Sequence, residues 1–130
     1  MNKKSLWLLI LSAIAIAIMK GTEVAFAIKP GVYGTLKPEM DPVMPAVAAV
    51  WNIHGLGIPT ISSIMDGTHM QGSKHPLGLA VDIRLNDIPL TLHETLRVEV
   101  LSIIDDRWFD VIHEYHGTDR DHLHIEYDPK

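Results

Sequence analysis

The 130-residue chain contains no cysteine, which excludes disulfide bonds and zinc sites built from thiolates. It has no basic tract either: acidic and basic residues are mixed along the sequence and the formal net charge is −5, so nucleic acid is not expected as a partner. Internal repeats and low-complexity linkers are also absent. With this length and 47% hydrophobic residues, the sequence predicts one small domain rather than two.

The longest apolar run is too short to span a membrane comfortably. It covers residues 6–19, whereas a transmembrane helix needs roughly 20 apolar residues. Lys3 and Lys4 precede the run, and Ala25-Phe26-Ala27 follows it as a small-x-small cleavage site. A positive start, an apolar run and small residues at the end are the pattern of a secretory signal.

This pattern predicts that the chain is divided into two parts. Residues 1–27 are expected to be a signal peptide, or a membrane anchor if they are not cleaved, and residues 28–130 the working domain. The domain would be exported, periplasmic or extracellular, and would meet the membrane only through its N-terminal segment. A helix docked on the domain is disfavoured, because the alanine and isoleucine repeat at 13–18 has no polar face.

Hydrophobic periodicity predicts two helices. The first begins near Pro42 and ends before Gly55, and the second covers residues 89–106, where Thr91 and Glu94 have the spacing of a capping box. Apolar residues recur every three or four positions in both and predict one buried face each. These faces consist of Val43, Met44, Val47, Val50 and Trp51 in the first helix and of Leu92, Leu96, Val100, Ile103 and Ile104 in the second.

Alternating and β-branched residues predict four strands. They cover residues 58–65, 79–85, 109–115 and 123–127, with polar or glycine-bearing turns between them. The expected fold class is therefore α+β: a small antiparallel sheet flanked by two main helices.

Two clusters of metal-binding side chains lie on the predicted strands or just before them. The first extends from Ser73 to Arg84 and contains His75 and Asp82. The second extends from Asp121 to Glu126 and contains two more imidazoles. Of the eight histidines in the chain, five lie in or beside the clusters, namely His75, His113, His116, His122 and His124.

Strand geometry explains how the two clusters could form one centre. Alternate side chains of a strand share a face, so His122 and His124 are expected to point the same way, with apolar neighbours behind them. Pro76 and Gly78 can turn the backbone so that His75 lies over Asp82. Imidazoles and one carboxylate suit zinc, and three protein ligands leave a fourth position for water. The pattern therefore predicts one divalent metal ion with a proton-transfer group beside it.

The same residues resemble the D-alanyl-D-alanine metallopeptidases, a family related to lysostaphin-type peptidases and to the hedgehog zinc domain. The family motif Ser-x-His-x-x-Gly-x-Ala-x-Asp is matched in full by Ser73, His75, Gly78, Ala80 and Asp82, and its His-x-His motif by His122 and His124. The resemblance covers roughly residues 58–128. It implies the fold of that family, with a zinc site on the antiparallel sheet.

Roles for individual residues follow from the resemblance. It implies one zinc ion held by His75, Asp82 and His124, with His122 beside the metal for proton transfer or transition-state stabilisation. Some branches of the family have a general base, a glutamate, three residues before the last zinc histidine. The nearest upstream candidate here is Glu114, ten residues before His124, which either reaches the site or faces solvent.

One feature of many relatives is missing. They have an arginine in the loop before the first motif, which meets the substrate carboxylate or the developing oxyanion. This chain has no arginine between Ile58 and Lys74. The candidates to replace it are Lys74, His69, Gln71 and Arg84.

The sequence thus predicts an exported zinc metallopeptidase, a hydrolase of peptidoglycan stem peptides. It is expected to be a D-Ala-D-Ala carboxypeptidase or an L-Ala-D-Glu endopeptidase, as a cell-wall remodelling enzyme or an endolysin, and to act as a monomer. The alternative is an exported, non-catalytic zinc-binding module that recognises a cell-wall peptide or a protein partner. The presence of His122 favours the enzyme.

Overall fold

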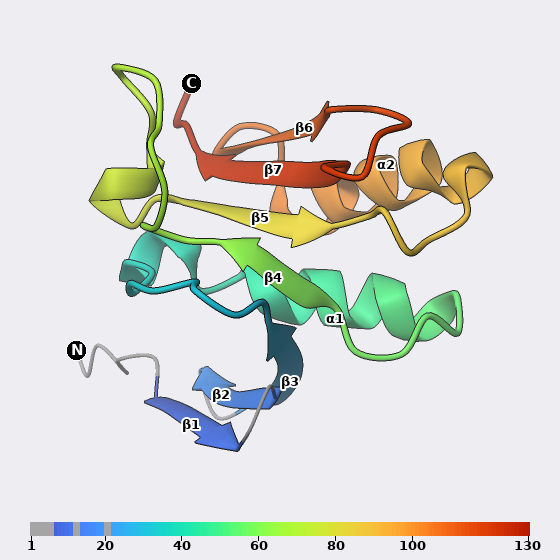
Figure 1. Cartoon of the computed structure of the whole chain (residues 1–130), viewed down its shortest axis with the longest axis horizontal. Helices are drawn as coiled ribbons and strands as arrows, with labels where there is room; N and C mark the ends of the chain where they lie inside the picture. Colours follow the sequence, from blue (N-terminus) through green and yellow to red (C-terminus); the bar gives the residue numbers. More distant parts are fainter. Residues whose placement is uncertain (1–6, 12–13, 20–21) are drawn as a thin grey trace.

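A mixed β-sheet covered by two helices forms the body of the protein (Figure 1). The computed structural model describes residues 7–11, 14–19 and 22–130. Its seven strands follow the order β1-β2-β3-β4-β5-β7-β6 across the sheet. The elements are β1 Trp7–Leu11, β2 Ile14–Met19, β3 Thr22–Ile28, α1 Val43–Ile53, β4 Thr60–Ser63, β5 Ala80–Arg84, α2 His93–Ile104, β6 Phe109–Glu114 and β7 His122–Tyr127, with short 3₁₀ turns at Pro38–Met40, His75–Leu77 and Leu90–Leu92. The predicted α+β class with two main helices is confirmed.

The four strands predicted from the sequence correspond to β4, β5, β6 and β7, which form the half of the sheet that ends at the β6 edge. β4, β5, β7 and β6 pair in that order, and each pair is antiparallel, as expected. The prediction of a wholly antiparallel sheet is wrong in one respect. β3, which was not predicted, pairs with β4 in parallel through Ala27 and Ile28, so the sheet is mixed.

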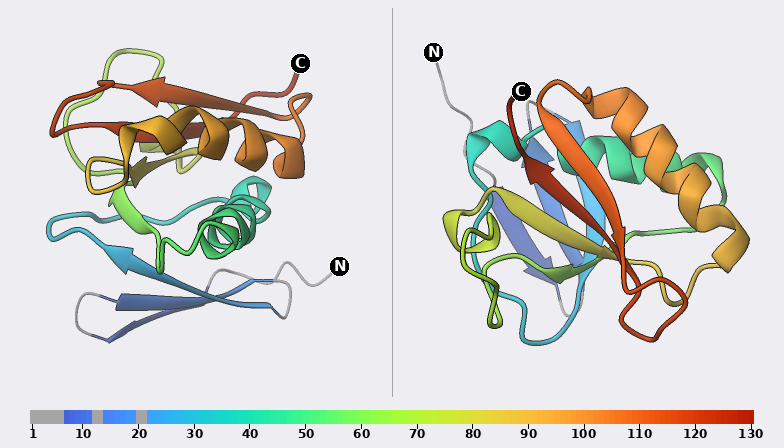
Figure 2. Two further views of the ribbon diagram at one scale, coloured as in Figure 1. Left: turned by 90° about the vertical axis from the view of Figure 1, so that its right-hand side faces the viewer. Right: turned by 90° about the horizontal axis from the view of Figure 1, so that it is seen from above.

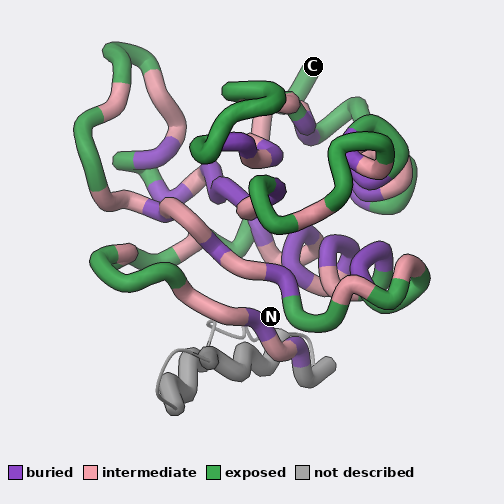
Figure 3. The backbone as a smooth tube through the Cα atoms, turned by 45° about the vertical axis from the view of Figure 1, so that its right-hand side comes forward, coloured by how far each residue is buried: buried purple, intermediate pink, exposed green. Residues whose placement is uncertain are grey.

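Both helices cover the same face of the sheet, as the two views of Figure 2 show. Leu123 and Ile125 of β7 and Val111 of β6 point to this face and are buried. His122 and His124 alternate with these residues along β7 and therefore point to the opposite face. Burial is concentrated on the central strands and on the helix sides that face them (Figure 3). The sheet therefore has one apolar face under the helices and one polar face open to the loops.

The buried face of α1 is the one that its periodicity predicted. All five of its predicted core residues, Val43, Met44, Val47, Val50 and Trp51, are at most 2% exposed. Pro45 lies in the first turn, where its missing amide costs no helical hydrogen bond. The helix ends at Ile53 and is followed by its C-cap, His54, and by Gly55, whose φ of +66° a glycine adopts without strain.

Helix α2 begins later than predicted and without the predicted cap. Residues 90–92 form a 3₁₀ turn, and no side chain caps the helix. Glu94 instead pairs with Arg97, its Oε1 lying 2.7 Å from Arg97 Nη2, so the capping-box prediction is wrong. Leu96, Val100 and Ile104 are buried as expected, whereas Ile103 is 54% exposed.

Strand β3 bears on the predicted division of the chain. The predicted export signal, residues 1–27, includes 1–6, 12–13 and 20–21, which lie outside the described residues. Within its described part, β3 contributes Val24 and Phe26 to the core, where they are 4% and 1% exposed. Cleavage after Ala27 would remove both side chains from the domain. Neither helix of the described chain combines the length and the apolar character needed to cross a membrane.

Replacement of Phe26 tests whether β3 belongs to the folded domain. Phe26→Ala is expected to lower the free energy of unfolding by about 3–5 kcal/mol, because it removes a fully buried aromatic side chain and leaves a cavity. Urea denaturation of the full chain measures the change. Tyr33→Ala is the control: this aromatic is 64% exposed, and its loss is expected to change stability by about 0.5 kcal/mol or less. Equal stabilities of the two variants would show that β3 does not pack on the core.

Candidate metal centre

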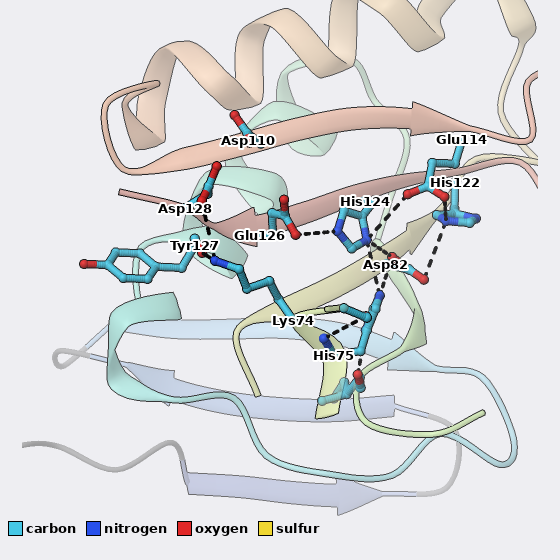
Figure 4. A network of polar contacts seen from close by, with 12 residues as sticks. Lys74, His75, Asp82, Asp110, Glu114, His122, His124, Glu126, Tyr127 and Asp128 are labelled. Atoms are coloured by element: carbon cyan, nitrogen blue, oxygen red, sulfur yellow. Dashed lines mark hydrogen bonds and ion pairs between the residues drawn. The ribbon is translucent and has the colours of Figure 1, made fainter. Parts of the chain in front are cut away.

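Three predicted side chains converge on the open face of the sheet. They come from the β4–β5 loop, from β5 and from β7 (Figure 4). His75 Nε2 lies 3.2 Å from Asp82 Oδ1 and 3.2 Å from His124 Nδ1, and His124 Nδ1 lies 2.9 Å from the same Asp82 oxygen. The three residues form a group whose ligand atoms are close enough to hold one metal ion.

The pairing of the strands creates this convergence. Asp82 of β5 lies directly opposite His124 of β7 in the antiparallel register, so their side chains stand next to each other on one face. Both strands also have apolar residues on the other face. The core therefore determines which residues point toward the site.

The turn before β5 brings His75 over this pair. Gly78 has a φ of +70° and its amide donates a hydrogen bond to the His75 carbonyl at 3.0 Å. A Cβ at this position would lie 2.6 Å from the carbonyl oxygen of Thr35, so only glycine fits. Ser73 Oγ accepts a hydrogen bond from the His75 amide at 3.2 Å.

Hydrogen bonds outside the cluster orient both imidazoles. His75 Nδ1 lies 2.6 Å from the carbonyl oxygen of Ile64, which can only accept, so Nδ1 carries the proton and Nε2 points its lone pair into the cluster. His124 Nε2 lies 3.2 Å from Glu126 Oε2, which leaves its Nδ1 on the cluster side. Metal-binding histidines commonly donate their second N–H to a carbonyl or a carboxylate in this way.

The arrangement of the three side chains suits a cation. Around a tetrahedral ion with bonds of about 2.0–2.2 Å, ligand atoms lie about 3.3–3.6 Å apart, close to the spacing found here. Burial alone would raise the pKa of Asp82, but hydrogen bonds from His124 and His75 hold it well below its usual value. Burial alone would lower the pKa of His124, but the bonds to Asp82 and Glu126 raise it to about 9. The cluster thus stabilises a positive charge beside the Asp82 carboxylate, as it would stabilise a metal ion there.

Two further predicted residues flank the three. Glu114 of β6 lies opposite His122 of β7 in register, and its Oε2 is 3.9 Å from His122 Nε2. Its other carboxylate oxygen lies 3.7 Å from His124 Nδ1. His122 Nε2 in turn lies 3.5 Å from Asp82 Oδ2. Of the two alternatives for Glu114, the structure therefore favours the one in which it reaches the site.

A cavity of about 700 Å³ opens over the cluster. This volume lies in the range of small-molecule and peptide sites. Three of the four candidates for the missing arginine line it, namely His69, Gln71 and Arg84. Lys74 is not among the lining residues, and its Nζ is engaged by the Tyr127 carbonyl at 3.0 Å and by Asp128. Arg120, which the sequence did not suggest, also lines the cavity.

Sequence reasoning missed two residues that support the cluster. Glu126 orients His124, and its position two residues further along the same strand could have revealed it by alternation. His69 stacks on His75, with ring centroids 4.2 Å apart and an angle of 13° between the planes. His69 lies in an irregular loop, where no spacing rule relates it to His75.

Comparisons with protein-family models, with curated proteins and with solved structures gave no match for this chain.

Protons and metal ions compete for His124, and this predicts a pH dependence. The pKa of His124 in the metal-free protein is about 9, above the ordinary value of 6.5, so at neutral pH a metal ion must displace a proton. The apparent affinity for Zn²⁺ is therefore expected to rise about tenfold per pH unit from pH 7 and to level off above pH 9. Competition with a chromophoric chelator at several pH values measures this. An affinity that stays constant over this range would contradict the prediction.

Glu126 provides a second test of the cluster. Glu126→Ala removes the carboxylate that orients His124 and is expected to weaken Zn²⁺ binding about 10–100-fold. Glu126→Gln is the matched control, because its amide oxygen can still accept the N–H of His124. Equal losses in the two variants would mean that this hydrogen bond does not position the ligand.

Proposed function

We propose that this protein is a zinc-dependent peptidase that hydrolyses peptidoglycan stem peptides, as a D-Ala-D-Ala carboxypeptidase or an L-Ala-D-Glu endopeptidase. The observation that supports it most strongly is the cluster of His75, Asp82 and His124 at the floor of an open cavity. Three protein ligands with one accessible position are typical of catalytic zinc, whereas structural zinc sites have four protein ligands. The resemblance of both motifs to the D-alanyl-D-alanine metallopeptidases supports the reaction class and the related fold.

The donor set fits zinc. Two neutral imidazole nitrogens and one carboxylate oxygen are borderline ligands that zinc accepts at tetrahedral spacing. When bound, zinc supplies a Lewis acid that polarises the scissile carbonyl and activates water at neutral pH. The remaining chemistry, which is proton transfer and the binding of the peptide, falls to side chains of this chain.

Glu114 has the position expected of a general base. Its two carboxylate oxygens face His122 and His124 at 3.9 and 3.7 Å, and its side chain is 39% exposed, so water can reach it. In this proposal Glu114 takes a proton from the attacking water and delivers it to the leaving amine.

His122 complements this role. Its Nδ1 lies 2.8 Å from the Arg120 carbonyl and therefore carries a proton, which leaves Nε2 directed toward Asp82 and Glu114. In the imidazolium form of His122, which carries a proton on both ring nitrogens throughout, Nε2 can donate a hydrogen bond to the oxyanion that develops on the scissile carbonyl.

Two arginines can recognise the acidic part of a stem peptide. Arg84 follows Asp82 on β5 and lies opposite His122, and both Arg84 and Arg120 line the cavity. A guanidinium binds a carboxylate through two parallel hydrogen bonds. In the proposed enzyme one of them replaces the arginine that relatives have in the loop before the first motif.

Removal of the proposed general base and of the proposed oxyanion donor tests the proposal. Glu114→Gln and His122→Ala are each expected to lower kcat about 10²–10⁴-fold on peptidoglycan stem peptides while one zinc ion stays at the cluster. Mass spectrometry of the products measures the rate and identifies the bond that is cut. His54→Ala is the control, since this histidine binds Glu99 away from the cavity and its loss is expected to leave the rate unchanged.

The outcomes separate the proposal from its alternatives. Zinc in the wild type without hydrolysis of any stem peptide would favour the non-catalytic zinc-binding module. Absence of zinc from the wild type would exclude both. Hydrolysis that persists unchanged in Glu114→Gln and His122→Ala would show that Glu114 does not transfer the proton and that His122 does not stabilise the oxyanion.

A further inference from the structure

A second cluster of metal-binding side chains lies at the end of the β6–β7 hairpin, on the side of the sheet that the helices cover. It consists of His93 in the first turn of α2, His113 near the end of β6, and His116 and Asp121 in the β6–β7 loop. The start of α2 and this loop are neighbours at one end of the molecule (Figure 2). Each of the four residues offers a ligand atom, and these atoms all lie within 4.8 Å of one another.

His93 has a buried nitrogen without a hydrogen-bond partner. Its Nε2 lies 2.9 Å from the carbonyl oxygen of Ile88, so this nitrogen carries the proton and Nδ1 presents a lone pair. Among the described residues, Nδ1 is the one buried side-chain nitrogen or oxygen that makes no hydrogen bond. It faces Asp121 Oδ2 at 3.2 Å, and the two residues are only 2% and 3% exposed. Two acceptors that face each other in a buried place need a proton or a metal ion between them.

The carboxylate of Asp121 is already supplied with donors. Its Oδ2 accepts the Gly117 amide at 2.8 Å, and its Oδ1 contacts His113 Nε2. Asp121 is therefore a negatively charged acceptor, and its charge is oriented toward the histidines.

The other two histidines complete the set. His116 Nδ1 lies 3.0 Å from His113 Nδ1 and 3.3 Å from His113 Nε2, and the ring centroids are 4.4 Å apart. The ring of His93 packs edge-on against that of His113, with centroids 5.2 Å apart. His93 Nδ1 and Asp121 Oδ2 lie 3.2 Å apart, and His116 Nδ1 lies 3.0–3.3 Å from the nitrogens of His113, one of which can be a ligand. All four ligand atoms lie within 4.8 Å of one another, whereas ligands of a tetrahedral zinc ion are roughly 3.3 Å apart, so small side-chain movements suffice to close the set around an ion.

We propose that His93, His113, His116 and Asp121 form a second metal site, which binds a divalent ion of the zinc class. Three imidazoles and one carboxylate provide four protein ligands, which is the number found in structural zinc sites and leaves no position for a substrate. The ligands come from the start of α2 and from both ends of the β6–β7 loop, so the ion joins the helix to the hairpin. The argument for this second site does not rest on the proposed peptidase activity.

The second site would also support the first one. His113 precedes Glu114, and Asp121 precedes His122, so each pair of neighbours serves opposite faces of the sheet. The loop between them contributes Tyr115 and Arg120 to the cavity. An ion held by the four residues therefore fixes the loop that lines one side of the cavity.

Zinc stoichiometry of the full 130-residue chain tests the proposal. After chelation, reloading with Zn²⁺ and gel filtration, elemental analysis is expected to give two zinc ions per wild-type chain. His75→Ala is expected to keep one, the double variant His113→Ala/His116→Ala also one, and the triple variant none. His54→Ala is the control and is expected to keep two, since this histidine belongs to neither cluster.

The zinc ion at the first cluster reports whether the double variant is folded, together with its circular dichroism. If that variant fails to fold, His116→Ala takes its place, because His116 is exposed, and one of the two ions is expected to bind at least about 10–100-fold more weakly. One zinc ion in the wild type that is lost in His75→Ala would overturn the proposal. Two zinc ions that survive in the double variant would overturn it as well, and so would unchanged affinity for both ions in His116→Ala.

Discussion

The register between β5 and β7 is the constraint on which the site depends. Asp82 and His124 are opposite each other only in this register, and apolar residues such as Ile83 and Ile125 lie under the helices in the same register. A slip of one residue would move these apolar side chains to the open face and the histidines into the core. The hydrophobic effect therefore selects, among the possible pairings, the one in which an imidazole and a carboxylate stand side by side. The packing of apolar side chains under the helices thus determines which polar side chains are adjacent on the open face of the sheet.

Much of this arrangement could be predicted from the sequence, because it depends on apolar residues that recur every two, three or four positions. Alternation identified the four strands β4 to β7, and spacing by three and four residues identified α1 and α2. The same alternation predicted that His122 and His124 share a face. The turn at Pro76 and Gly78 was predicted to bring His75 over Asp82, and the αL conformation of Gly78 is the physical basis of that turn.

What could not be predicted depends on contacts between distant segments. β3 was not predicted, because an apolar run after two lysines has the pattern of an export signal and the pairing with β4 leaves no local mark. The capping box failed because Arg97 competes for Glu94. The position of Glu114 at the site follows from the pairing of β6 with β7 and not from its spacing to His124. The cluster of His93, His113, His116 and Asp121 has no motif, since a helix and a loop far apart in the chain contribute to it.

The loop of residues 115–121 has a consequence for how this protein can vary. Surface loops usually tolerate insertions and deletions, because their length affects little beyond the loop itself. Here the residues at both ends of the loop belong to one of the two clusters or its surroundings. Glu114 and His122 lie on the open face of the sheet, and His113 and Asp121 lie on the face that the helices cover. An added residue would have to bulge outward without moving either end of the loop; if a strand absorbed it, side chains would exchange faces. The length of this loop is therefore under geometric control, unlike the β4–β5 loop, in which a bulge far from His75 would leave the strand pairing intact.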